Sequence, residues 1–326
     1  MKATAKAHPI QGLVKYHGMR DEELRLPYHD SISLCTAPSH TKTTVEFDSD
    51  READTYVVDG EVVEGRGAER IRAVVDHVRD LADVEAGVRF ESENSFPTNV
   101  GFGSSSSGFA AAAMALVEAA GLEMSRPEIS TVARRGSSSA ARAVTGGFSH
   151  LRAGLNDEDC RSERIPVPDT LESDLRIVGG LVPSYKETEQ AHEEAAESHM
   201  FGARLAHVHG QIAEMRDALR DGDFHRTFEL AEGDTLSLTA TTMTGPAGWV
   251  YWQPRTIAIF NAVRELRREE GVPVYFSADT GASVYVNTSQ EHVDRVEAAI
   301  ADCGVETRVW ELGGPARVLD ESEALF

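Results

Sequence analysis

The sequence predicts an α+β fold with two domains. Its 326 residues are too many for one ordinary domain of roughly 100–200 residues and suit two. In the first half, strand-like stretches lead into a glycine- and serine-rich loop that an alanine-rich helix follows at once. The second half ends in a strand–strand–helix–strand pattern typical of an α+β sandwich. Periodicity breaks off at residues 166–173, so we expect the domains to cover residues 1–170 and 171–326.

Local signals define the elements of the first half. Asp59-Gly60 suits a type I′ turn and indicates a hairpin. Ser125 and Glu128 form a capping box with a proline between them, which begins a short helix that ends near Gly136. Alternation and helical periodicity supply the rest. The predicted elements are strands over 3–18, 31–47 and 88–92, the hairpin over 56–63, and helices over 71–81, about 104–120 and up to about 136.

The second half mixes buried strands with longer helices. Residues 175–182 read as a buried strand because they are almost wholly apolar or glycine. Asp279-Thr-Gly281 lies between two short strands, and Gly304 follows the last helix. The predicted elements are helices near 190–221, 223–233, 254–270 and 289–302, and strands over 272–277, 283–287 and 305–312.

Composition narrows the class of protein. Asp and Glu number 54 against 32 Lys and Arg, a net charge of −22, which disfavours binding to nucleic acid or to anionic lipid. The longest apolar run, residues 109–117, is far shorter than the ~20 residues that span a bilayer, and we expect a cytoplasmic chain. Only five of the 32 basic residues are lysine; with the acidic excess, this is typical of a protein kept soluble in concentrated salt. Three scattered cysteines favour neither disulfides nor a metal cluster.

A phosphate-binding loop is predicted at residues 94–108. Gly101 and Gly103 let backbone amides approach a ligand closely, because glycine has no Cβ. The helix that follows directs unpaired N–H groups and the positive end of its dipole to the same place. Serine hydroxyls at 104–107 can donate to phosphate oxygens or help to hold Mg²⁺. The Gly-Lys-Ser/Thr of a Walker A motif is missing, so this is a different kind of nucleotide loop.

Four stretches resemble one enzyme family. Residues 97–105, Pro-x-x-x-Gly-x-Gly-Ser-Ser, are similar to the ATP loop of the GHMP kinases. Three others resemble the mevalonate diphosphate decarboxylase branch of that superfamily: residues 15–33, with Lys-Tyr-His-Gly-Met-Arg-Asp, Leu-Pro and Ser-Ile-Ser; residues 133–148, with Arg-Gly-Ser-Ser-Ser-Ala-Ala-Arg and Gly-Gly-Phe; and residues 277–282, with Ser-Ala-Asp-Thr-Gly-Ala. The resemblance implies a GHMP kinase-like fold, with an S5-like N-terminal domain and a ferredoxin-like C-terminal domain.

The resemblance also implies a reaction, the ATP-dependent decarboxylation of a phosphorylated mevalonate in isoprenoid biosynthesis. Asp279 would then direct the 3-hydroxyl, Lys15 would neutralise charge beside it, and Arg142 would capture the substrate carboxylate. Arg142 shares a helical face with Ser138 and Ser139, which fits that role. Further expected substrate contacts are Tyr16, Met19, Arg20, Ser138 and Ser139. ATP is expected on Asn94, Pro97, Gly101, Gly103, Ser104, Ser105 and Ser106, with Ser105 as the candidate ligand of Mg²⁺, in a chain that forms homodimers.

The chain departs from the family pattern where the substrate is handled. A lysine of the family motif is Met19 here, its tryptophan is His17, and Asp30 replaces a small polar residue. The segment after Lys186 lacks a second lysine. Less positive charge suits a substrate with fewer phosphate charges, so we expect mevalonate 5-phosphate as substrate and isopentenyl phosphate as product.

Other functions stay open at this point. The chain could use mevalonate 5-diphosphate and form isopentenyl diphosphate. It could also phosphorylate the 3-hydroxyl of mevalonate without decarboxylation. A non-catalytic ATP-binding relative is a fourth interpretation, but such a protein would be expected to lose Asp279 or the serine loop, and both are present.

Overall fold

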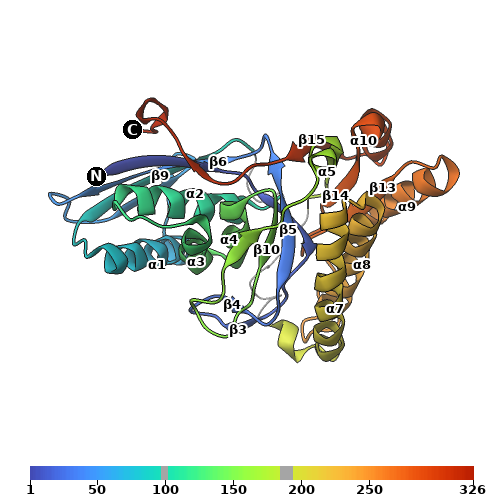
Figure 1. Cartoon of the computed structure of the whole chain (residues 1–326), viewed down its shortest axis with the longest axis horizontal. Coiled ribbons are helices and arrows are strands. Elements are labelled where there is room, and N and C mark those ends of the chain that lie inside the picture. Colours follow the sequence, from blue (N-terminus) through green and yellow to red (C-terminus); the bar gives the residue numbers. More distant parts are fainter. Residues whose placement is uncertain (97–101, 184–193) are drawn as a thin grey trace.

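The fold was analysed in a computed structural model that describes residues 1–96, 102–183 and 194–326. The N-terminal half and helices α1 to α4 lie on one side, helices α7 to α9 lie on the other, and strands β5 and β10 run between them (Figure 1). None of the helices in the described residues is long and apolar enough to cross a membrane.

The first sheet forms the base of the N-terminal half. Its strand order is β16-β1-β6-β9-β7-β8, and all pairs are antiparallel except β7 with β9. Helix α2 lies against β1 and β6, which its alanine-rich sequence allows because small side chains permit close approach. The elements of this half are β1 (Lys2–Ala7), β2 (Ile10–Val14), β3 (Met19–Asp21), β4 (Leu26–Pro27), β5 (Ser31–Ala37), β6 (Thr41–Asp48), β7 (Thr55–Val58), β8 (Glu61–Val62), α1 (Gly65–Ala82), β9 (Gly87–Asn94), α2 (Ser104–Ala119), α3 (Arg126–Gly136), α4 (Ser138–Thr145), β10 (Phe148–Leu151) and β11 (Ser162–Arg164).

The second sheet joins the two halves of the chain. Its order is β11-β10-β5-β15-β12-β14-β13, with β2 also paired to β5, so β5 and β15 connect N-terminal and C-terminal strands. Its other elements are α5 (Asp169–Asp174), β12 (Leu175–Leu181), α7 (Phe201–Asp221), α8 (Phe224–Met243), α9 (Pro254–Glu269), β13 (Val274–Ser277), β14 (Val284–Ser289), α10 (Val293–Ala301), β15 (Glu306–Leu312) and β16 (Arg317–Val318). Strand β2 lies against helices α7 and α8, and β13 lies against α8.

Several local predictions are confirmed and others need correction. Asp59 and Gly60 both have positive φ, 52° and 81°, as a type I′ turn requires, and the capping box at Ser125 is present. The predicted strand over 3–18 is two strands that break at His8 and Pro9. The predicted strand over 31–47 breaks at residues 38–40. The helix predicted over 223–233 continues to Met243, because the polar residues in its middle are buried rather than terminal.

The C-terminal segment returns to the N-terminal half. After β15 the chain crosses the molecule, and β16 pairs with β1 (Figure 1). The amide of Ala316 donates to the carbonyl of Val144 at 3.1 Å, at the end of α4. There Gly146 has φ 66° and ψ 176°, and a Cβ on it would lie 2.3 Å from the backbone of Pro315. Glycine is thus required for this crossing, since other residues scarcely adopt that conformation.

Gly146→Ala should destabilise the fold by about 3 kcal/mol or more, since backbone strain and a backbone clash add. Gly121→Ala is the matched control, because Gly121 also has positive φ, 69°, but open space around it. The control should cost only the roughly 1–2 kcal/mol of left-handed strain. Urea titrations of both variants decide this, and equal losses would show that the contact with Pro315 does not matter.

Candidate active site

A buried ion network holds Lys15 at the end of β2. The Lys15 ammonium lies 3.6 Å from Oδ2 of Asp234 and donates to the hydroxyl of Thr235 at 3.3 Å. The Lys15 amide donates to the same Asp234 oxygen at 2.9 Å. Arg204 donates to Asp234 Oδ1 at 3.0 Å and to the Lys15 carbonyl at 2.6 Å. Since Asp234 is 0% exposed, its charge is compensated entirely within this cluster, and the lysine is fixed through both backbone and side chain.

The surroundings of Lys15 bear directly on its charge. Burial lowers the pKa of the ammonium, and the carboxylates of Asp234 and Asp279 act against that shift. The sequence predicted that Lys15 and Asp279 face one another, and the structure brings them together.

Asp279 follows β13 and faces Lys15 across Gly12. The Gly12 amide donates to Asp279 Oδ1 at 3.3 Å. A Cβ on Gly12 would lie 2.8 Å from that oxygen and 2.5 Å from Cγ of Lys15. Glycine at this position is what lets the two side chains lie side by side. Thr235 holds the neighbouring backbone, because its hydroxyl accepts the amide of Ala278 at 3.1 Å.

Arg142 lies beside Tyr16, on α4. Its guanidinium carbon is 5.4 Å from the centre of the Tyr16 ring, and the residue is only 3% exposed. Its Nε and Nη1 make no hydrogen bond to any part of the chain that the structure describes. Burial lowers the pKa of this guanidinium, and the neighbouring Tyr16, Asp279 and Cys35 act in the opposite direction. A buried cation with two unsatisfied N–H groups is suited to receive an anion, above all a carboxylate.

The serines before Arg142 hold the adjacent hairpin of β3 and β4. Ser138 donates to the Arg25 carbonyl at 2.7 Å and lies 3.8 Å from the sulfur of Met19. Ser139 and Ser137 share a hydrogen bond of 2.8 Å. Ser138 and Met19 are therefore in contact, and Tyr16 lies beside Arg142, one turn further along the helix that Ser138 begins. Their contact with a substrate stays a prediction.

Arg20 lies on the outer side of that hairpin. Its guanidinium donates to four backbone carbonyls: Pro27 at 3.3 Å, Ala153 at 3.0 Å, Gly154 at 3.1 Å and Leu155 at 3.3 Å. Arg20 thereby ties the hairpin to the loop that follows β10. The predicted contact between Arg20 and substrate stays a prediction, but the described role of Arg20 is to hold this loop.

The serine loop is anchored onto β2. Gly103, with φ 73°, precedes α2, and Ser106 donates to its carbonyl at 2.6 Å and accepts the Ile10 amide at 3.2 Å. Ser104 is half-buried and Ser105 is exposed in the first turn of the helix. Their hydroxyls and the first amides of α2 stand together at the start of the helix, and their binding of ATP stays a prediction. Asn94 is bonded to Thr41 and Asp59. Pro97 and Gly101 lie outside the described residues.

Asp30 is not an uncompensated charge. It accepts from Nε2 of His150 and from the amide of Ala153, both at 2.8 Å. Burial acts to raise the pKa of Asp30, but these hydrogen bonds outweigh it and the pKa is lowered. The predicted repulsion between Asp30 and a second phosphate is therefore weakened by its partners.

Sequence reasoning missed Asp234, Arg204 and Thr235. They carry no motif, and each stands among the charged and polar residues of a helix. The one available signal was that Asp234 and Thr235 fall at helical spacing from Ala231 and Leu238, on an otherwise apolar face. Within the described residues, no three His, Cys, Asp or Glu side chains gather as a metal site.

Asp234→Asn should destabilise the chain by about 3–5 kcal/mol, because it removes the carboxylate that the buried cations Lys15 and Arg204 share. Glu214→Gln is the matched control: Glu214 pairs with Arg226 on the surface, where both side chains are about half exposed and their attraction is screened. The control should change the urea unfolding curve little. If Asp234→Asn were equally mild, the network would not hold Lys15.

Comparisons with known proteins place the chain in a family. A family model for the diphosphomevalonate decarboxylase-like N-terminal domain matches residues 7–162. Over the full length of both chains, the sequence is 76% identical to a Haloferax volcanii protein named phosphomevalonate decarboxylase. Human diphosphomevalonate decarboxylase is 28% identical over 88% of this chain and 77% of its own length.

Solved structures agree with that assignment. The crystal structure of mevalonate diphosphate decarboxylase from Staphylococcus aureus matches with a TM-score of 0.93 at 27% identity, over 98% of both chains. A structure of the protein MDDEF in complex with MVAPP, AMPPCP and magnesium matches with a TM-score of 0.90 at 28% identity, over 98% of this chain and 99% of that one. These matches confirm the predicted α+β, two-domain GHMP kinase-like fold, and the chain belongs to the family of phosphomevalonate and diphosphomevalonate decarboxylases.

Proposed function

We propose that the chain catalyses the ATP-dependent decarboxylation of mevalonate 5-phosphate to isopentenyl phosphate, CO₂, ADP and phosphate, a step of isoprenoid biosynthesis. The observation that carries this proposal is the sequence identity of 76%, over the full length of both chains, to the Haloferax volcanii protein named phosphomevalonate decarboxylase. The proposal is supported by Asp279, whose charge acts on both Lys15 and Arg142. The reaction needs one carboxylate and two cations around the same substrate.

Asp279 receives or orients the proton of the 3-hydroxyl as that oxygen attacks the γ-phosphorus of ATP. Lys15 stabilises the negative charge that collects between the hydroxyl oxygen and the transferring phosphoryl group. The bond from the phosphorus to ADP breaks in this step. Mg²⁺ bound with ATP neutralises phosphate charge.

Arg142 orients the substrate carboxylate through its unsatisfied N–H groups. When the 3-phosphate leaves with the electrons of its C–O bond, the bond to the carboxylate carbon breaks. Its electron pair forms the alkene, and CO₂ departs. A buried site favours the conversion of the charged carboxylate into neutral CO₂, because the carboxylate has already lost its hydration when it binds.

ATP is proposed to bind at Gly103 and the first turn of α2, through the amides and the hydroxyls of Ser104 and Ser105. Ser106 is proposed as the residue that fixes this turn on β2. Ser105 stays the proposed ligand of Mg²⁺, since it is exposed at the cradle. The complex of MDDEF with AMPPCP and magnesium supports the choice of cofactors.

We also propose four properties of the whole protein: its salt adaptation, oligomeric state, cellular location and domain boundary. Adaptation to high salt is supported by the charge of −22, the scarcity of lysine and the Haloferax relative. A homodimer and a cytoplasmic location follow from the resemblance and the composition. A domain boundary near residue 170 is supported by the short helix α5 that leads into β12.

Asp279→Asn should lower kcat by about 10²–10⁴-fold with little change in size or fold, because it removes the group that directs the hydroxyl proton. Affinity for ATP, measured by calorimetry, should stay within about twofold. Arg152→Gln is a control on the surface, where Arg152 pairs with Glu163. Near-normal turnover by Asp279→Asn would remove this carboxylate from the mechanism.

The chain should prefer mevalonate 5-phosphate to the diphosphate in kcat/KM, because Met19 offers neither a charge nor a donor at the hairpin. Met19→Lys should move the ratio of the two kcat/KM values toward the diphosphate by roughly 5–150-fold, the value of one charge-assisted hydrogen bond.

Mass spectrometry of the products formed from each ester, with ATP present, tests both the reaction and this preference. A wild-type preference for the diphosphate would favour the second candidate, diphosphomevalonate decarboxylase, which the more distant relatives at 27–28% identity support. A phosphorylated product without CO₂ release would indicate a kinase instead.

A further inference from the structure

The turn between β3 and β4 carries an arginine in a strained backbone conformation. Arg25 has φ 52°, in the left-handed region that residues other than glycine rarely occupy. Within the turn, the amide of Leu24 donates to Oδ1 of Asp21 at 2.8 Å. A strained non-glycine residue persists only where its surroundings hold it, and such residues gather at functional sites.

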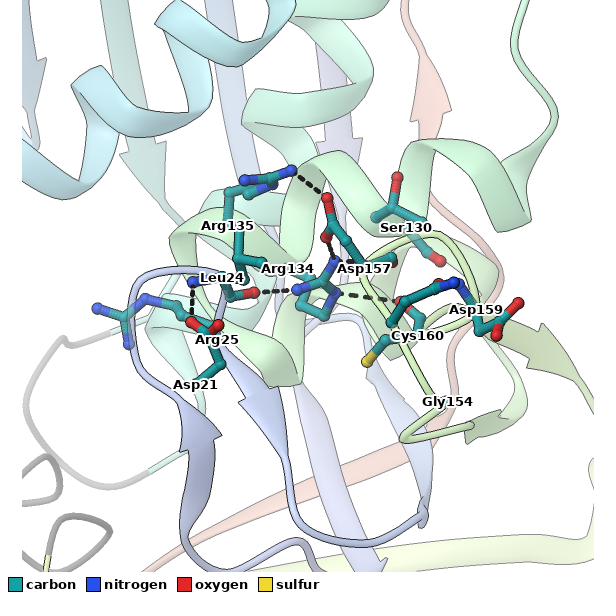
Figure 2. Close-up of polar contacts among 12 residues, drawn as sticks. Asp21, Leu24, Arg25, Ser130, Arg134, Arg135, Gly154, Asp157, Asp159 and Cys160 are labelled. Atoms are coloured by element: carbon teal, nitrogen blue, oxygen red, sulfur yellow. Dashed lines mark hydrogen bonds and ion pairs between the residues drawn. The ribbon is translucent and has the colours of Figure 1, made fainter.

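A buried arginine holds this turn from one side. Arg134 is fully buried, donates to the carbonyls of Leu24 and Cys160, and pairs with Asp157, which also binds Arg135 (Figure 2). Through these bonds the turn is joined to α3 and to the loop that follows β10. Because a buried guanidinium must keep its partners, this anchor resists any shift of the turn.

The other side of the turn faces the candidate active site. The Arg25 carbonyl accepts from Ser138, the first residue of the helix that carries Arg142, and Ser138 also touches the sulfur of Met19. The Arg25 side chain extends away from the Arg134 cluster in Figure 2. Its charge acts on the Tyr16 hydroxyl together with the charge of Arg142, and both oppose the rise in the pKa of Tyr16 that burial causes.

Two other arginines near the turn serve the fold. Arg20 donates to four backbone carbonyls at the outer side of the hairpin. Arg70 donates twice to the carbonyl of Gly136 and lies over the ring of Phe109. The Arg25 backbone lies on the inner side of the hairpin, where its carbonyl accepts from Ser138 and Ser138 contacts Met19, and the charge of Arg25 acts on Tyr16.

We infer that Arg25 binds the 5-phosphate of the substrate and supplies the cation that Met19 does not. This inference rests on the proposed function and assigns one end of that substrate. A planar guanidinium fits two phosphate oxygens at once, which an ammonium in the position of Met19 would not do in the same way. Held on a turn with two anchors, the side chain loses little additional freedom when the phosphate binds.

The test compares Arg25→Gln and Arg25→Gly with wild type at one fixed salt concentration. Both variants should raise the KM for mevalonate 5-phosphate by about 10–100-fold, the value of a charge-assisted contact, and leave the KM for ATP within about twofold. Glycine suits the left-handed backbone, so the Tm of Arg25→Gly should be at least that of wild type. Arg152→Gln, which removes a surface arginine, should change neither constant.

Calorimetry with mevalonate 5-phosphate and with mevalonate separates the outcomes. Arg25→Gln should weaken binding of the phosphate ester about as much as it raises KM, and leave binding of unphosphorylated mevalonate unchanged. Equal binding of the ester by wild type and both variants would overturn the inference, as would an equal loss for mevalonate. If wild type forms no product from either ester, the proposed function fails, and the binding of the ester still decides the role of Arg25.

Discussion

The buried carboxylate of Asp234 is the constraint on which the site depends. It accepts the Lys15 amide and the Arg204 guanidinium and forms an ion pair with the Lys15 ammonium, so the end of a strand of the N-terminal half is tied to two helices of the C-terminal half. Water cannot replace these partners at a residue without exposure. Such a network is not a strong source of stability in itself, since its burial is costly. What it achieves is position: the ammonium cannot leave the side of Asp279 without leaving Asp234.

A chain with a net charge of −22 here builds a site rich in cations. Lys15 and Arg142 are both buried, and burial lowers the pKa of each, which means that their charge is held at a cost that an anionic ligand relieves. Concentrated salt screens the acidic surface within a few ångströms, to about 3 Å at 1 M, but screens buried groups much less. The negative potential of the acidic surface therefore does not cancel the positive potential of the buried cations in the site.

Local chemistry was readable from the sequence, and long-range contact was not. The Asp59-Gly60 turn, the capping box at Ser125 and the loop before α2 each depend on neighbouring residues, and each was found. Lys15, Asp279 and Arg142 were recognised through motifs. Asp234 was missed instead, because the helix predicted over 223–233 stops one residue before it, whereas the helix continues to Met243. Its polarity belongs to the site rather than to a terminus, and only the packing of α8 against β2 reveals this.

The hydrogen-bond partners of the residues that depart from the family pattern show which departures bear on the substrate. Asp30, which adds negative charge to the hairpin region, accepts hydrogen bonds from His150 and from the amide of Ala153. Repulsion is then a weak basis for selecting a substrate. The hairpin differs in its cations: a lysine of the family motif is Met19 here, while Arg25 stands on a turn whose carbonyls accept from Arg134 and Ser138. A guanidinium fixed in this way favours one phosphate at a defined position, because it offers planar, directional donors rather than the mobile point charge of a lysine.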